Sequence, residues 1–173
     1  MLYPIFSVVA VLILIVLALG FSRPATFRVE RSISIKAPPA AIYAILSDFR
    51  QSECWSPWEK KDLNMKKIFG GPASGKGATY EWDGDKNVGH GRQEIVDVVP
   101  NSKIVIQLDF FRPFQGTNTV EFLLEPAGDS TTFRWVMYGP TNFIVRVLCF
   151  NMDKMIGTDF EAGLANLKQH LEQ

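Results

Sequence analysis

The central part of the chain is dominated by short segments in which apolar and polar residues alternate. In one of them, apolar side chains occupy every second position from Ile104 to Phe110, which is the period of a β-strand with one buried face. Consecutive strands with tight turns form an antiparallel meander, and because one face of such a sheet is polar, the other face needs a cover. The predicted strands cover residues 63–69, 78–82, 91–99, 104–110, 118–124 and 133–137.

The flanking segments supply a further strand and the cover. Residues 27–35 alternate as well, and the prolines at 38–39 precede a short helix predicted over 40–46, because proline is favoured at a helix start. A second short helix is expected from Asp48 to just before Trp55. One long amphipathic helix is predicted over 142–171, lying across the sheet. Its apolar residues are Met152, Met155, Ile156, Phe160, Leu164, Leu167 and Leu171.

The N-terminus carries an uninterrupted apolar run over residues 5–21 in which Ser7 is the one polar residue. Seventeen residues in a helix reach roughly 26 Å, enough to cross a thin bilayer core. We therefore predict a transmembrane anchor over residues 1–22 and a separate domain over 23–173. A cleaved signal peptide is the alternative, since residues 18–20 form a small-residue cleavage site, but no basic residue precedes the run.

Basic residues follow the apolar run and none precedes it, with Arg23, Arg28, Arg31 and Lys36 all on its C-terminal side. The positive-inside rule then favours a single-pass membrane protein whose domain faces the cytoplasm. Some of these charges belong to the predicted first strand, so the periplasmic orientation stays open.

Composition and motifs argue against several classes of protein. Eighteen basic and eighteen acidic residues give no net charge, so no basic face for nucleic acid is expected. Cys54 and Cys149 have no CxxC partner and are predicted to be buried free thiols, while His90 and His170 are isolated surface residues. The glycine-rich loop at 70–77 lacks the ending of a phosphate-binding loop. We therefore predict no metal, no cofactor and no catalytic set.

Several local sequences, taken in order, resemble one known superfamily. They are residues 29–33 with 37–39, the Trp55-Ser56-Pro57-Trp58 segment, the glycines around 71–77, residues 93–95 with 100–101, and residues 157–168. From about residue 27 onward the chain resembles the START-like (SRPBCC) superfamily, specifically its polyketide cyclase/dehydrase and lipid-transport branch. The resemblance implies the helix-grip fold, an α+β fold in which a curved antiparallel sheet wraps around a long C-terminal helix. It also implies a deep apolar cavity, but no particular catalytic residue.

The inward positions of the strands supply candidate ligand-binding residues. Ligand cavities are mostly apolar with a few placed polar groups. Gln93 and Asn118 are the candidate polar groups, since both share the parity of apolar neighbours. Hydrogen bonding to the backbone or to solvent is the alternative for these two amides, and plain core packing is the alternative for the apolar candidates. The apolar candidates are Tyr80, Trp82, Trp135 and Met137.

Three further positions carry more specific expectations. Arg31 falls on the apolar parity of its strand, so it either pairs with a carboxylate of the protein or clamps one on a ligand. The helix start at 143–150 is apolar on nearly every side, and tryptophan is favoured at membrane interfaces. Trp58 and Ile144 are therefore predicted to flank a portal turned toward the bilayer, unless the tryptophan loop caps the core.

Three functions fit this sequence. The favoured one is a membrane-tethered protein that binds or transfers a lipid or another hydrophobic small molecule. A cyclase or dehydratase acting on a hydrophobic substrate is the second, and an interaction module without a ligand is the third. A copurifying unchanged ligand, an altered product, or a filled core would distinguish them.

Overall fold

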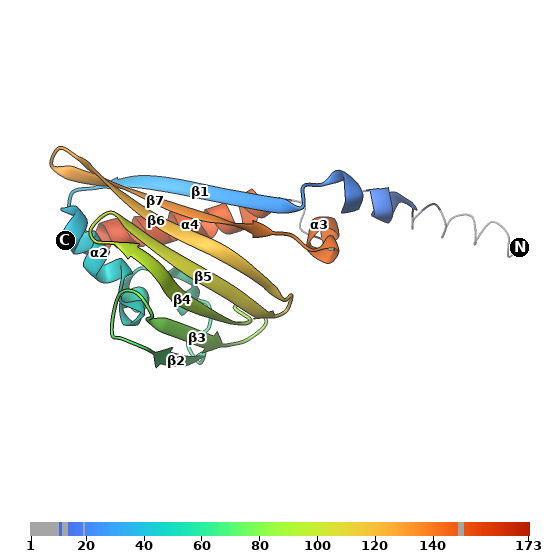
Figure 1. Cartoon of the computed structure of the whole chain (residues 1–173), viewed down its shortest axis with the longest axis horizontal. Coiled ribbons are helices and arrows are strands. Elements are labelled where there is room, and N and C mark those ends of the chain that lie inside the picture. Colours follow the sequence, from blue (N-terminus) through green and yellow to red (C-terminus); the bar gives the residue numbers. More distant parts are fainter. Residues whose placement is uncertain (1–10, 12–13, 19, 149–150) are drawn as a thin grey trace, which may run out of the picture.

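Seven strands form one antiparallel sheet in the order β1-β7-β6-β5-β4-β3-β2 (Figure 1). The computed structural model describes residues 11, 14–18, 20–148 and 151–173. Six strands follow each other as a meander, and β1 joins its end by pairing with β7. The strands are β1 (Thr26–Ile35), β2 (Lys66–Gly70), β3 (Thr79–Asp83), β4 (His90–Val99), β5 (Lys103–Arg112), β6 (Gly116–Ala127) and β7 (Ser130–Pro140).

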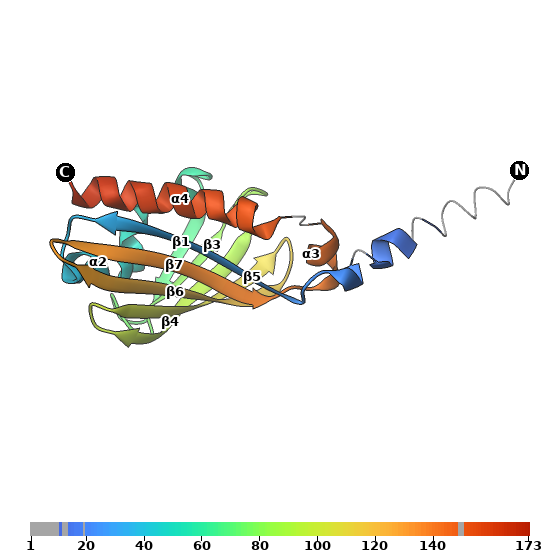
Figure 2. The ribbon, with the colours of Figure 1, turned by 90° about the horizontal axis from the view of Figure 1, so that it is seen from above.

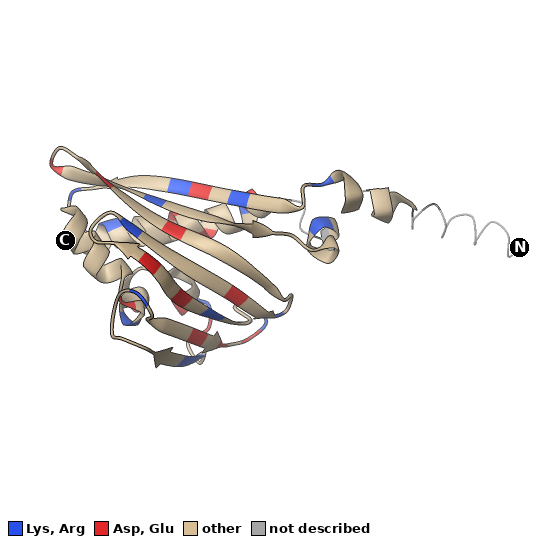
Figure 3. Cartoon of the chain, in the orientation of Figure 1, with Lys and Arg blue, Asp and Glu red and all other residues tan. Residues whose placement is uncertain are grey.

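The alternation in the sequence sets the two faces of this sheet. Phe122 of β6 lies opposite Trp135 of β7, and Val29 of β1 lies opposite Met137. All four side chains are buried, as expected when alternate residues point to the covered face. Basic and acidic positions are interspersed along the strands (Figure 3), in keeping with the balanced composition.

The first connection wraps one end of the sheet. It contains helix α2 (Pro39–Leu46) and two 3₁₀ helices, η1 (Phe49–Cys54) and η2 (Pro57–Lys60). Proline at the start of α2 has no N–H to leave unpaired. The Asp48 carboxylate accepts a hydrogen bond from the Arg50 backbone and so caps η1. Both predicted short helices are thereby confirmed.

The long C-terminal helix α4 (Met152–Leu171) covers the apolar face of the sheet, running beside β1 (Figure 2). The predicted single helix over 142–171 was wrong, because a separate short helix, α3 (Phe143–Leu148), precedes α4. Asn151 starts α4, with its side-chain oxygen accepting from the Lys154 backbone at 2.8 Å. Asparagine at such a cap favours a new helix start, which the apolar periodicity did not reveal.

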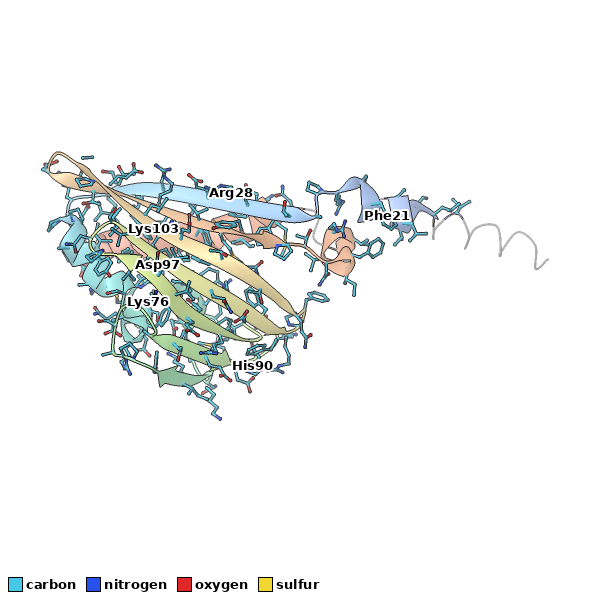
Figure 4. The ribbon with its side chains drawn as sticks, viewed as in Figure 1. Phe21, Arg28, Lys76, His90, Asp97 and Lys103 are labelled. Atoms are coloured by element: carbon cyan, nitrogen blue, oxygen red, sulfur yellow. The ribbon has the colours of Figure 1, made fainter. Side chains whose placement is uncertain are left out.

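Helix α3 lies at the end of the domain from which the N-terminal segment extends (Figures 1 and 2). The Phe21 and Phe143 rings approach to 5.7 Å between centroids, and Figure 4 labels Phe21 beside this helix. The Arg146 guanidinium donates to the Gly20 carbonyl at 3.3 Å. These contacts join α3 to Gly20 and Phe21, the residues shortly before β1.

The predicted anchor over residues 1–22 falls largely outside the described residues, which omit 1–10, 12–13 and 19. Within the described part of the chain, no helix has the length and apolar character needed to cross a membrane.

Two further sequence predictions have clear outcomes. Arg31 pairs with two carboxylates of α4, those of Asp153 at 2.9 Å and Glu161 at 2.6 Å. Arg31 therefore forms an ion pair within the protein rather than a clamp for a ligand.

The strand predicted at 63–69 begins later, at Lys66. Asp62 folds the preceding residues into a turn by accepting from the Asn64 backbone, and Leu63 is left exposed.

Candidate functional site

A cavity of about 370 Å³ lies between the covered face of the sheet, α4 and the connection from α2 to η2. Its volume falls in the range of small-molecule sites, roughly 300–1,000 Å³. All four tryptophans of the sequence line it. The apolar lining includes Ile45, Leu46, Phe49, Trp55, Trp58, Met65, Tyr80, Trp82, Leu108, Phe110, Val120, Phe122, Trp135, Met137, Ile156 and Phe160.

Aromatic rings form the wall of the cavity on the side of α4. Trp135 stacks on Phe160 with ring centroids 4.0 Å apart, and both Trp55 and Trp58 meet Trp135 edge-on. Gly163 permits this packing, because a Cβ atom there would lie 2.8 Å from the Trp135 ring. The indole N–H of Trp135 is buried and has no hydrogen-bond partner among the described residues. This wall therefore carries one unsatisfied donor.

A buried carboxylate also lines the cavity. Glu59 of η2 is only 7% exposed, and its Oε1 accepts a hydrogen bond from the Tyr80 hydroxyl at 2.9 Å. Its Oε2 lies 2.5 Å from the amino group of Lys67, which also contacts Glu53 at 2.7 Å. The group ties η2 to strands β2 and β3. A buried charge must be paired in this way to be tolerated.

The surroundings of Tyr80 and Lys67 raise the pKa of both side chains. Burial of the Tyr80 phenol, together with the charge of Glu59, raises the pKa of Tyr80 far above its ordinary value. Tyr80 therefore stays protonated at physiological pH and holds its bond to Glu59. Burial of Lys67 opposes its charge, but its hydrogen bonds to Glu53 and Glu59 outweigh that and raise the pKa of Lys67.

The cavity is closed at one end and open at the other. Buried residues of α2 and η1, including Leu46 and Phe49, close the end near Tyr80. Exposed residues line the opposite end: Lys86 and Asn87 of the β3–β4 turn, Arg112 at the end of β5, Pro113 of the β5–β6 turn, and Met155 of α4. The β5–β6 turn lies at the same end of the domain as α3 and the N-terminal segment (Figure 1).

Six of the eight predicted site residues line this cavity: Trp58, Tyr80, Trp82, Gln93, Trp135 and Met137. Asn118 is buried but outside the lining, where its side chain packs against Gly139. Ile144 is 52% exposed on α3 and is not a lining residue. Since Trp58 packs on Trp135 and Phe160, the structure does not bring Trp58 and Ile144 together.

Glu59 is a lining residue that the sequence did not predict. A glutamate between a tryptophan and a lysine reads as an exposed residue of a short helix, and its partners Lys67 and Tyr80 come from two later strands. The one available signal is that Glu59 follows Trp58 in a segment rich in large apolar residues. Such a signal does not distinguish a buried carboxylate from a solvated one.

The described residues hold no group of three or more metal-ligating side chains. Cys54 is a free thiol, partly buried where full burial was predicted, and burial raises its pKa. Cys149 lies outside the described residues. His90 contacts Glu81 at 3.1 Å and the Phe111 ring, away from the cavity lining, and His170 is exposed on α4.

Comparison with known proteins agrees with the observed fold. The sequence profile of the polyketide cyclase / dehydrase and lipid transport family matches residues 26–172. The chain belongs to this family. The START-like superfamily resemblance is thereby confirmed, and the seven-stranded sheet with its C-terminal helix is the expected helix-grip fold. No curated protein matches the sequence.

Solved structures of this fold share little sequence with the chain. The Aha1 protein from Colwellia psychrerythraea, solved as a dimer, is 20% identical with a TM-score of 0.61, covering 84% of this chain and 96% of its own. Protein CV1439 from Chromobacterium violaceum is 16% identical with a TM-score of 0.62, covering 87% and 99%. The di-domain aromatase/cyclase StfQ of steffimycin biosynthesis is 11% identical with a TM-score of 0.64, covering 86% and 51%. At these identities the likeness establishes the fold alone.

Proposed function

We propose that this protein is a membrane-tethered carrier that binds, and transfers, a lipid or another hydrophobic small molecule held in its internal cavity. The observation that carries the proposal is the cavity of about 370 Å³ with a mostly apolar lining. A ligand-free interaction module would be expected to have a filled core, because protein interiors are packed with few voids larger than a water molecule.

The position of the open end supports the membrane tether. The β5–β6 turn, whose Pro113 lines that end, lies on the side of the domain from which the N-terminal segment extends (Figure 1). Phe111 and Phe114 are exposed beside it, and exposed apolar side chains close to one another often mark membrane or ligand contacts. A bilayer-inserted segment over residues 5–21 would bring this end near lipid and raise the effective concentration of the domain there.

The basic residues that follow the apolar run favour one orientation of the domain relative to the membrane. Arg23 precedes β1 and, together with Arg28 and Arg31 of β1, follows the apolar run. We propose the cytoplasmic orientation on this basis. Arg31 belongs to a folded ion pair, so Arg23 is the residue of this group nearest to the proposed bilayer surface.

The cargo can be tested directly on purified full-length protein. Native mass spectrometry followed by solvent extraction should find a hydrophobic molecule bound at up to one copy per chain. The matched control is Leu108→Trp, which fills the cavity from β5 and should lower the ligand content while the domain stays folded. A ligand content that the substitution leaves unchanged would contradict the cavity as the binding site.

The tether needs a separate test. After carbonate washing, the full-length protein should stay in the membrane fraction, and residues 23–173 alone should be soluble and folded. Recovery of full-length protein in the soluble fraction, or a mature N-terminus near Phe21, would contradict the tether without affecting the cavity.

A cyclase or dehydratase is the second candidate function, and the hydrogen-bonded pair of Glu59 and Tyr80 favours it. A buried carboxylate and phenol inside an apolar cavity could move a proton on a bound substrate. The extraction described above distinguishes the two functions. A molecule that the protein releases unchanged supports a carrier, whereas conversion of an added substrate that Glu59→Gln abolishes supports an enzyme.

A further inference from the structure

The lining of the cavity contains a buried carboxylate hydrogen-bonded to a phenol, Glu59 with Tyr80, and this pair bears on which ligands the cavity accepts. We propose that Glu59 and Tyr80 recognise the polar head of the apolar ligand, and that this head is a neutral hydroxyl group rather than a carboxylate. The inference rests on the proposed carrier function and specifies its ligand class.

The charges around Glu59 disfavour a carboxylate on the ligand. Lys67 faces both Glu53 and Glu59, so one positive charge is shared between two negative ones and the group keeps a net negative charge. The basic lining residues, Lys86 and Arg112, are exposed at the open end, and Arg112 pairs with Asp83. Among the described lining residues, no cation therefore reaches the closed end, where a carboxylate ligand would meet a like charge.

The hydrogen-bonding groups of Tyr80 and Glu59 favour a ligand that donates a hydrogen bond. Tyr80 uses its single hydrogen to donate to Glu59, and its oxygen keeps the capacity to accept another hydrogen bond. The second lone pair of the Glu59 Oε1 is also an acceptor. A ligand hydroxyl supplies the matching donor, whereas an ionised carboxylate has only acceptors.

Trp135 adds a hydrogen-bond donor to the cavity lining. Its buried indole N–H lines the same cavity and has no partner among the described residues. Leaving a buried donor unsatisfied costs free energy, and an oxygen atom of a bound ligand would satisfy it. A ligand with hydroxyl oxygen therefore suits the polar groups of this lining, which offer acceptors at Glu59 and Tyr80 and a donor at Trp135.

The four lining tryptophans give a direct measurement. Full-length protein in lipid nanodiscs is titrated at neutral pH with ω-bromoundecanol or ω-bromoundecanoate, whose bromine quenches tryptophan fluorescence at close range. The quantity compared is the ratio of the carboxylate Kd to the alcohol Kd. Because each probe partitions into the same lipid in every sample, changes in this ratio between variants report on the protein.

In the wild type the alcohol should bind more tightly. Glu59→Gln removes the negative charge and should lower the ratio about tenfold, by weakening the alcohol and admitting the carboxylate beside Lys67. Tyr80→Phe keeps the ring that stacks on Phe69 and should weaken the alcohol about fivefold while leaving the carboxylate within twofold. It tests the proposal even if Glu59→Gln does not fold.

Glu53→Gln is the matched control. It also removes a carboxylate from Lys67, but Glu53 is exposed to water and outside the cavity lining. Solvent screens its charge, so the ratio should fall much less than in Glu59→Gln. A ratio unchanged in both Glu59→Gln and Tyr80→Phe, with both probes still quenching, would overturn this inference and leave the carrier function standing. Absence of quenching by either probe would overturn both.

Discussion

The two ends of the cavity differ in how their side chains are used. At the closed end, α2 and η1 pack Leu46 and Phe49 against the sheet, and Glu59 is buried against Tyr80 and Lys67. At the open end, apolar side chains such as Phe114 and Met155 stay exposed beside charged turns. Buried apolar area stabilises a fold and exposed area does not. Stability should therefore depend on the closed end, and ligand exchange on the open end.

The largest expected difference concerns two phenylalanines. Phe133 of β7 is completely buried and packs edge-on against Phe122, whereas Phe114 of the β5–β6 turn is 38% exposed. Phe133→Ala should lower the free energy of unfolding by about 3–5 kcal/mol. Phe114→Ala should change it by no more than about 0.5 kcal/mol. Urea unfolding followed by circular dichroism measures both, and equal losses would remove the distinction between the two ends.

Two glycines provide a second matched pair. A methyl group added at Gly163 would meet the Trp135 ring at 2.8 Å and Pro57 at 3.2 Å, while one added at Gly116 would meet nothing within 4 Å. Overpacking of about 1–3 kcal/mol should outweigh the gain in helix propensity of up to about 1 kcal/mol in Gly163→Ala. Gly116→Ala should be close to neutral. Thermal unfolding compares the variants, and a stabilised Gly163→Ala would contradict the close packing.

Ligand exchange should show the opposite dependence. Phe114→Ser should slow transfer of a fluorescent alcohol from donor vesicles several-fold, because an apolar contact at the open end would be lost. Val99→Ser is the control, since Val99 is also exposed but ends β4 at the other end of the sheet. Stopped-flow fluorescence measures the rates. If both substitutions slow transfer equally, the open end has no special role in exchange.

The smallest expected effect concerns pH. Hydrogen bonds from Arg31 lower the pKa of Asp153 below its ordinary value, which is about 3.9. This contact therefore stabilises the fold above about pH 4, and its contribution is lost as pH falls through the lowered pKa. Asp153→Asn should slightly lower the urea midpoint at pH 7 and lose less stability than the wild type on acidification. Asp129→Asn, on the exposed β6–β7 turn, should change neither.

Much of the fold could be predicted because its signals are local. The alternation from Ile104 to Phe110 and the three-and-four spacing from Phe160 to Leu167 each follow from the geometry of one element. The inward residues Tyr80 and Trp135 were identified in the same way. The break between α3 and α4 was missed, because the apolar pattern continues through a position where Asn151 begins a new helix.

The sequence by itself determined which side chains face inward, because the period of each strand and helix is a property of its own backbone. Only the tertiary structure decided whether those side chains would fill the interior or surround a cavity, since that depends on the distance between the sheet and α4. It also decided that Glu59 is buried, by bringing Lys67 and Tyr80 to it from two later strands. A charge is buried only where distant partners compensate its desolvation, and no local pattern records them.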